Sequence, residues 1–173
     1  MEADIRQATL ADISRVSAVL CEAAAWLAQR GIPLWKQEEL QPSAIQADVA
    51  RGFYFLALES GSPVGTFKYQ PEDPLHWPDA VPQEAAYIHR IAVRRSHSGG
   101  ELASLLLRFA ANRTRSEGRQ YLRLDCDSAR PKLRAIYERF GFVHHSDRQV
   151  GFYHVARYQL SAASAATSAR TSW

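Results

Sequence analysis

The chain has 173 residues, of which 46% are hydrophobic and 23% are charged, enough for one domain with a substantial core. No stretch approaches the roughly 18 uncharged apolar residues of a membrane span, and the N-terminus carries acids early and lacks the apolar h-region of a signal peptide. Two cysteines, Cys21 and Cys126, are too few for a disulfide framework. We therefore expect a cytoplasmic protein with no membrane partner.

The net charge of +3 is mild, and acids stand among the arginines of residues 90–139. A nucleic-acid-binding stripe would need a stronger and more continuous excess of positive charge, so we expect no nucleic-acid partner. None of the six histidines pairs with Cys or Glu at zinc-ligand spacing. The sequence therefore predicts no metal site, and its mild positive charge suits a small anionic ligand.

The first 70 residues predict a strand, two helices and a hairpin. Thr9 precedes Asp12 by three positions, as in a capping box, and apolar residues then recur at helical spacing. Gly31 and Pro33 end this first helix. The expected elements are a strand over 4–8, helices over 11–29 and 42–51, and paired strands over 53–59 and 64–70.

Prolines place the following residues, 71–83, in a loop. Beyond it, strand-like apolar runs alternate with apolar patterns at helical spacing. The expected strands cover 85–93, 120–126, 142–147 and 150–160, and the expected helices cover 99–117 and 133–140. The small, polar segment 161–173 predicts a disordered tail after a domain that spans residues 1–160.

This order of elements predicts an α/β fold with a single mixed, mostly antiparallel β-sheet and helices on both faces. The strand–helix–strand unit over 86–126 should form a right-handed crossover, which makes its two strands parallel.

The turn inside that crossover, SHSGGELA at 96–103, allows two interpretations. Glycines before a helix N-terminus, with basic residues on the approach, are typical of a phosphate site. Alternatively, Ser98 and Glu101 have the spacing of a capping box, in which case the helix caps itself. Glu101 also brings a negative charge to the place where a pyrophosphate would bind.

Several motifs together resemble the GNAT superfamily of N-acetyltransferases. The strand ending Ile91-Ala92-Val93, the helix with Leu106-Leu107 and the sequence Tyr137–Phe142, with Gly141 and Phe142 at its end, match the family pattern. The element order agrees over about residues 4–160. The chain departs from that pattern at Ser98, where the family has Arg or Gln, at Glu101, where it has Gly, and at Arg130, where it usually has Asn.

The resemblance implies direct acetyl transfer from acetyl-CoA to a primary amine of a small molecule or peptide, without a metal. It places the pantetheine arm beside Ile91, Ala92 and Val93. It places the pyrophosphate at the loop and helix start. The basic residue that the family has in this loop is missing, and Arg94, Arg95 or Arg130 could take its place by reaching the phosphates. The loop positions are His97, Ser98, Gly99, Gly100, Glu101, Leu102 and Ala103.

Three residues are candidates for proton transfer. Tyr137 matches the tyrosine that protonates the leaving thiolate in the family, although a tyrosine on an apolar helix face is also ordinary core. Histidine is the usual general base near neutral pH, which makes His89 a candidate, and His89 shares a face with Ile91 unless a bulge intervenes. Glu84 is the other candidate base, whereas Asp125 is a weaker one, and Cys126 has no partnered base that would make it a nucleophile.

The loop after the first helix is the natural wall of an acceptor pocket, where Glu22, Trp26 and Trp35 suit an amine with an apolar body. Simple packing explains these residues equally well.

A second functional hypothesis is that the chain has the same fold but does not catalyse acetyl transfer. In it the altered loop has lost productive CoA binding, and the chain acts as a binding or interaction module, for example as a homodimer.

Overall fold

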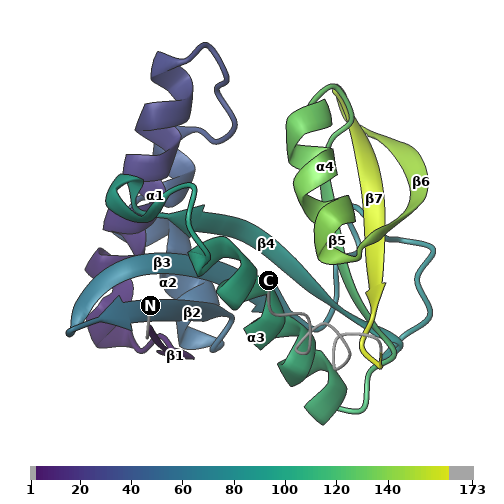
Figure 1. Cartoon of the computed structure of the whole chain (residues 1–173), viewed down its shortest axis with the longest axis horizontal. Helices are drawn as coiled ribbons and strands as arrows, with labels where there is room; N and C mark the ends of the chain where they lie inside the picture. Colours follow the sequence, from purple (N-terminus) through teal and green to yellow (C-terminus); the bar gives the residue numbers. More distant parts are fainter. Residues whose placement is uncertain (1–2, 164–173) are drawn as a thin grey trace. The chain divides into compact units, whose positions relative to one another are not determined.

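The computed structural model describes residues 3–163, whose seven strands form one sheet in the order β1-β2-β3-β4-β5-β7-β6 (Figure 1). The strands are β1 (Asp4–Gln7), β2 (Tyr54–Glu59), β3 (Ser62–Gln70), β4 (Ala85–Val93), β5 (Tyr121–Asp127), β6 (Val143–Val150) and β7 (Tyr153–Ser161). The helices are α1 (Ile13–Gln29), α2 (Pro42–Ala50), α3 (Leu102–Ser116) and α4 (Pro131–Phe140), with short turns η1 (Leu10–Asp12), η2 (Gln37–Leu40) and η3 (Arg95–His97).

The predicted sheet is confirmed. Strands β4 and β5 pair in parallel, as expected for the crossover through α3. The pairs β1–β2, β2–β3, β5–β7 and β6–β7 are antiparallel. The described residues form two compact units, one holding residues 3–69 together with Arg90–Leu106, the other holding Gln70–His89 and residues 107–163.

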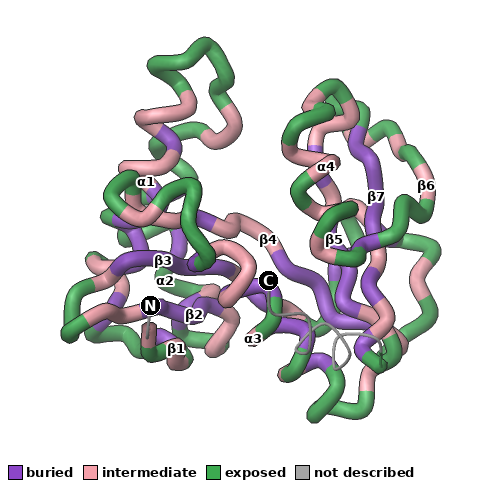
Figure 2. Tube along the Cα trace, viewed as in Figure 1, coloured by how far each residue is buried: buried purple, intermediate pink, exposed green. Residues whose placement is uncertain are grey.

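In the first unit, α1 and α2 pack on one face of the sheet through an apolar cluster. Figure 2 shows how continuous the burial is along β2 and β3. The cluster's buried members include Val16, Val19, Leu20, Ala24, Leu40, Ile45, Val49, Tyr54, Leu56 and Ala92. Because side chains alternate along a strand, Ala57 and its partner Gly65 face the other side.

On that other side, α3 approaches the sheet directly at Gly65. A Cβ atom there would lie 3.3 Å from the Leu106 side chain and 3.3 Å from the Ala92 carbonyl oxygen. Glycine therefore lets the helix pack closely, because a side chain here would be tight against α3 and β4. Helices cover both faces of this part of the sheet, as predicted.

The start of α1 is fixed by the buried carboxylate of Asp12. It accepts the Thr9 backbone N–H at 3.0 Å, as the predicted capping box requires, and pairs with Arg6 at 2.7 Å. The Arg6 hydrogen bond holds the pKa of Asp12 well below its usual range, against the effect of burial. The ion pair is therefore retained throughout the neutral range.

In the second unit, the end of α4 explains the Tyr137–Phe142 motif. Gly141 has a left-handed φ of +114°, and the amides of Gly141 and Phe142 donate to the carbonyls of Glu138 and Tyr137 at 3.0 Å each. This is a Schellman cap, which requires glycine at the left-handed position. The Tyr137 and Phe142 rings then meet edge to face, 6.0 Å apart.

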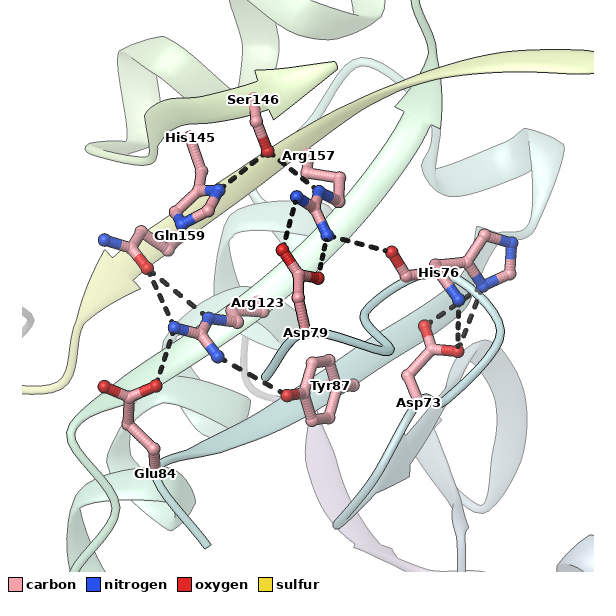
Figure 3. A network of polar contacts seen from close by, with 10 residues as sticks. All are labelled: Asp73, His76, Asp79, Glu84, Tyr87, Arg123, His145, Ser146, Arg157 and Gln159. Atoms are coloured by element: carbon pink, nitrogen blue, oxygen red, sulfur yellow. Dashed lines mark hydrogen bonds and ion pairs between the residues drawn. The ribbon is translucent and has the colours of Figure 1, made fainter. Parts of the chain in front are cut away.

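Two buried arginines fasten the proline-rich loop before β4. Arg123 and Arg157 each place a guanidinium over the Trp77 ring, at 4.8 and 4.6 Å. Arg157 pairs with Asp79 at 2.6 Å, and Arg123 pairs with Glu84 at 2.9 Å, as Figure 3 shows. The segment that the sequence places in a loop is therefore tightly held, although it lacks regular structure.

Several predicted boundaries move. Helix α3 begins at Leu102 instead of residue 99, because Gly99 has a positive φ of +79° and the preceding turn η3 occupies Arg95–His97. Strand β6 runs on to Val150 and β7 begins at Tyr153, three residues later than predicted in both cases. The last strand runs to Ser161, the first residue of the predicted tail over 161–173, and residues 164–173 of that tail lie outside the described residues. Within residues 3–163, no helix is both long and apolar enough to cross a membrane.

The core of the first unit can be tested with two leucines. Leu20 is fully buried, so Leu20→Ala should lower the free energy of unfolding by about 2–5 kcal/mol through lost burial and a cavity. Leu10 is 58% exposed, and Leu10→Ala should change it by less than about 0.5 kcal/mol. Urea denaturation of both variants measures the difference, and equal effects would contradict the assigned core.

Candidate active site

The backbone of strand β4 departs from regular strand geometry near His89 and Arg90. Its register with β5 covers Ala85–Tyr87, so the backbone of Ile91–Val93 lies beyond the residues that pair with β5. Arg90 has a left-handed φ of +51°, a strained conformation for a residue with a side chain. The strict alternation that would place His89 and Ile91 on one face is therefore interrupted by a local irregularity.

The Arg90 side chain helps to hold this conformation. Its guanidinium donates to the Tyr54 hydroxyl and to the Glu39 carbonyl, both at 3.1 Å. Because Tyr54 is fully buried in the core, the strained residue is anchored to a rigid part of the first unit.

In the second unit, His89 belongs to a closed ring of two histidines and two aspartates. His89 places Nε2 3.0 Å from Asp73 and Nδ1 3.7 Å from Asp125. His76 places Nδ1 3.1 Å from Asp73 and Nε2 3.8 Å from Asp125. Each imidazole thus bridges both carboxylates, and we call these four residues the His–Asp ring. Figure 3 shows its Asp73–His76 edge.

The two carboxylates of the ring differ in their electrostatics. Burial would raise the pKa of Asp73, but the hydrogen bond from His76 and the close approach of the His89 imidazole outweigh it and hold that pKa well below the usual range. Burial raises the pKa of Asp125, and the two histidines offset it only in part. Burial acts to lower the pKa of His76, yet Asp73 and Asp125 together raise it. The ring therefore favours positive charge on the His76 imidazole.

Tyr137 lies on α4 near the end of β5. Burial, with Cys126 and Asp125 nearby, raises the pKa of its phenol well above the usual value. None of the described residues forms a hydrogen bond with the Tyr137 hydroxyl, so this group is protonated and free to donate. Burial and the neighbouring Asp125 raise the pKa of Cys126 to about 11, which keeps it a neutral thiol.

Glu84, the other predicted base, is engaged elsewhere. Its carboxylate accepts from the buried Arg123 at 2.9 Å, and its carbonyl oxygen accepts the Gln120 amide at 2.9 Å. Both contacts give Glu84 a part in fastening β4 to β5 and leave it outside the His–Asp ring.

The loop after β4 does not form the capping box that Ser98 and Glu101 suggest. Ser98 ends the turn η3, donates its hydroxyl to the Arg95 carbonyl at 2.9 Å and accepts from the Arg95 guanidinium at 2.8 Å. The helix starts four residues after Ser98, and the Glu101 carbonyl accepts its first bond, from Leu105. The self-capping interpretation is therefore wrong.

The phosphate interpretation gains from the same geometry. No acceptor among residues 3–163 engages the backbone amides of Gly99, Gly100 and Glu101, which precede α3. Together with the first amides of the helix they form a set of donors suited to an anion. All three residues are exposed, and so is the Glu101 side chain, which opposes that anion by its charge.

Two predicted acceptor-pocket residues instead brace this loop. Glu22 accepts the Arg95 amide at 2.8 Å and pairs with the Arg94 guanidinium. These hydrogen bonds lower the pKa of Glu22 although burial opposes them. The Trp26 ring lies 4.4 Å from the Arg95 guanidinium and 4.4 Å from that of Arg30. The basic residues on the approach to the loop are therefore already partnered.

The remaining predicted contacts are dispersed. Trp35 packs against the core of the first unit, and His97 places Nε2 2.9 Å from Glu59. Leu102 is fully buried and Ala103 half-buried at the start of α3. Arg130 precedes α4, and its Nη1 atom is buried without a hydrogen-bond partner in the described chain.

Sequence reasoning missed Asp73 and His76 as site residues. Both lie in the proline-rich loop, which carries no periodic pattern. The signal that could have found them is the spacing Asp-x-x-His, which puts a carboxylate and an imidazole within reach in a turn.

Comparison with known proteins identifies the class. The model of the acetyltransferase (GNAT) family matches residues 20–142. The chain is 26% identical over 137 residues to the uncharacterized N-acetyltransferase YesJ of Bacillus subtilis, covering 76% of each chain.

Solved structures show the same fold. A GNAT-family acetyltransferase of Listeria monocytogenes superposes with a TM-score of 0.77 at 23% identity, over 92% of this chain and 96% of that one. The YncA protein of Salmonella typhimurium, solved with its cofactor acetyl-CoA, gives 0.70 at 16% identity, over 94% and 95%. The chain belongs to the GNAT family of acetyltransferases, as its motifs predict.

The Cys126 environment can be tested by alkylation. In Cys21→Ser, which keeps only Cys126, iodoacetamide should react very slowly at pH 7, because a pKa of about 11 leaves about one thiolate in ten thousand thiols. The rate should rise with pH towards 11 as the thiolate forms. The matched variant Cys126→Ser keeps the partly exposed Cys21 as a reference. Mass spectrometry measures both, and fast labelling of Cys126 at pH 7 would contradict its neutral state.

Proposed function

We propose that this chain transfers an acetyl group from acetyl-CoA directly to a primary amine of a small molecule or peptide. The observation that carries the proposal is the placement of His89 on β4, between two carboxylates and just beyond the residues that pair with β5. Family membership supplies the reaction class, and this histidine supplies the base that the reaction needs.

His89 is suited to activate the amine. A primary amine arrives as an ammonium ion and must lose a proton before its nitrogen can attack. An imidazole accepts a proton near neutral pH, and carboxylates on both sides stabilise the imidazolium that results. Asp73 and Asp125 supply these carboxylates in the His–Asp ring, and their negative charge also favours a cationic acceptor.

The transfer then proceeds without a covalent enzyme intermediate. The amine nitrogen bonds to the thioester carbonyl carbon, and the carbon–sulfur bond breaks as the tetrahedral intermediate collapses. Tyr137 donates its phenolic proton to the leaving thiolate. The attacking nitrogen then carries one proton more than the amide product needs, and this proton restores the phenol. The neutral state of Cys126 supports direct transfer over an acetyl-cysteine route.

Acetyl-CoA binding would use backbone groups more than side chains. Ile91–Val93 lie beyond the register with β5, so their peptide groups suit the extended pantetheine arm. The amides of Gly99 and Gly100 with the N-terminus of α3 suit the pyrophosphate. The buried Nη1 of Arg130 adds a charged donor that lacks a partner.

The negative charge of Glu101 should weaken the affinity of the loop for acetyl-CoA, and substitutions can test this. Glu101→Gly should tighten acetyl-CoA binding by about two- to fivefold, because it removes a negative charge beside the helix N-terminus. Glu101→Gln should give most of this gain if charge is the cause, and Glu38→Gln, which removes an exposed charge from η2, should give none. Calorimetric titration at low and moderate salt measures the affinities.

Two results would count against this account. Unchanged affinity in Glu101→Gly and Glu101→Gln would show that the loop does not contact phosphate. Absence of binding at millimolar acetyl-CoA in every variant would overturn the enzyme proposal. It would favour the second function, a non-catalytic interaction module, for which the partnered state of Arg94 and Arg95 is the supporting observation.

Turnover provides the direct test of function. Release of the CoA thiol is measured with amino acids, polyamines and peptide N-termini as acceptors. One of these classes of amine should support release and the others should not.

Tyr137→Phe should lower the turnover about a hundredfold or more while leaving acetyl-CoA affinity nearly unchanged, since it removes only the proton donor. Tyr153→Phe, at a 68% exposed position, is the control. Full activity in Tyr137→Phe would remove this tyrosine from the mechanism.

A further inference from the structure

Three members of the His–Asp ring can present ligand atoms close enough together for a metal-ion coordination shell. Ligand atoms around a tetrahedral Zn²⁺, each about 2.0–2.1 Å from the ion, lie about 3.3 Å from one another. Asp73, His89 and Asp125 can each present one ligand atom with all three within 4.8 Å, so small side-chain rotations would complete a site.

Two atoms of the ring lack hydrogen-bond partners. The Nε2 atom of His89 and the Oδ1 atom of Asp125 are buried, and no group among residues 3–163 satisfies them with hydrogen-bond geometry. The 3.0 Å approach of His89 to Asp73 is therefore a close contact of opposite polarity and not a directed hydrogen bond. Unsatisfied buried polar atoms are rare and costly, and a cation between them would satisfy both.

Charge and ligand type select the class of ion. Two neutral imidazoles with two carboxylates carry a total charge of −2, which a divalent cation balances. Mg²⁺ and Ca²⁺ prefer shells of oxygen atoms, whereas imidazole suits zinc and its first-row neighbours. The chain spacings of 3, 13 and 36 residues between successive ring members match no familiar zinc motif, so only the fold brings the four together.

We propose that Asp73, His89 and Asp125 bind a zinc-type divalent transition-metal ion, that His76 positions Asp73 for it, and that the bound ion switches off the base. One nitrogen of His89 and one oxygen of each aspartate would coordinate the ion. The His76 imidazole, 3.1 Å from the Asp73 carboxylate, would hold that ligand in place. The last part rests on the proposed function: a metal-bound His89 has no lone pair for the amine proton, so transfer stops until the ion is removed.

Binding is tested on the full chain after treatment with EDTA and its removal. Calorimetric titration should give one Zn²⁺ per chain, and Co²⁺ should give the intense visible absorption of a tetrahedral site. His76→Gln and Asp125→Asn should each weaken Zn²⁺ binding by more than about tenfold. The matched control is His144→Gln, because His144 and Asp147 form an exposed pair with the same spacing and a 3.0 Å contact. That variant should bind Zn²⁺ as tightly as the original chain.

Circular dichroism and thermal unfolding of each variant show that it is folded. His76 is the better first target because its side chain is 24% exposed, and Asp125→Asn serves if His76→Gln does not fold. Absence of Zn²⁺ heat and of Co²⁺ absorption in the original chain would overturn the site. So would equal affinity in folded His76→Gln and in the original chain.

Inhibition of acetyl transfer by the bound ion is measured separately, as the rate of thiol release. Thiol release should fall at least about tenfold when the site is filled with Zn²⁺ and should recover on addition of EDTA, while His76→Gln should need correspondingly more Zn²⁺. Zn²⁺ binding without loss of turnover would overturn the switch. A chain without any turnover would overturn the proposed function, yet the calorimetry and the Co²⁺ spectrum would still decide the metal site.

Discussion

The backbone of β4 between Tyr87 and Ile91 is the constraint on which the candidate site depends. Pairing with β5 covers residues up to Tyr87, and Arg90 then takes a left-handed conformation that costs about 1–3 kcal/mol in a residue with a side chain. Hydrogen bonds from Arg90 to Tyr54 and Glu39 offset part of that cost. His89, the proposed base, therefore directly precedes a strained residue that the core of the first unit holds in place.

The loop before β4 performs the second half of this positioning. It supplies Asp73 and His76, and the buried Arg157 holds its Asp79 and stacks on its Trp77. The Asp73 carboxylate accepts from the backbone amide of His76 and lies 3.1 Å from its imidazole. A segment without regular structure thus holds charged groups rigidly enough to shape the electrostatics of the site.

In the turn after β4, the contacts that stabilise the loop also occupy the positive charges that could bind an anion. Glu22 and Trp26 of α1 contact the guanidinium groups of Arg94 and Arg95, and these contacts hold the turn in place. The backbone amides before α3 are left as the main donors, and Glu101 opposes them. Affinity for an anion would then depend chiefly on peptide dipoles, which a change of side chain does not remove.

The sequence by itself determined the order and type of the elements, because apolar periodicity, the capping box at Thr9 and the glycine required after Phe140 are local properties. It also pointed to His89 and Tyr137 through their place in a strand and a motif. Only the tertiary structure decided which charged groups meet. Asp73, His76 and Asp125 gather around His89 from separate segments, and Ser98 turns back to Arg95 rather than forward to Glu101. Such pairings depend on long-range packing and backbone dihedral angles, which residue spacing does not encode.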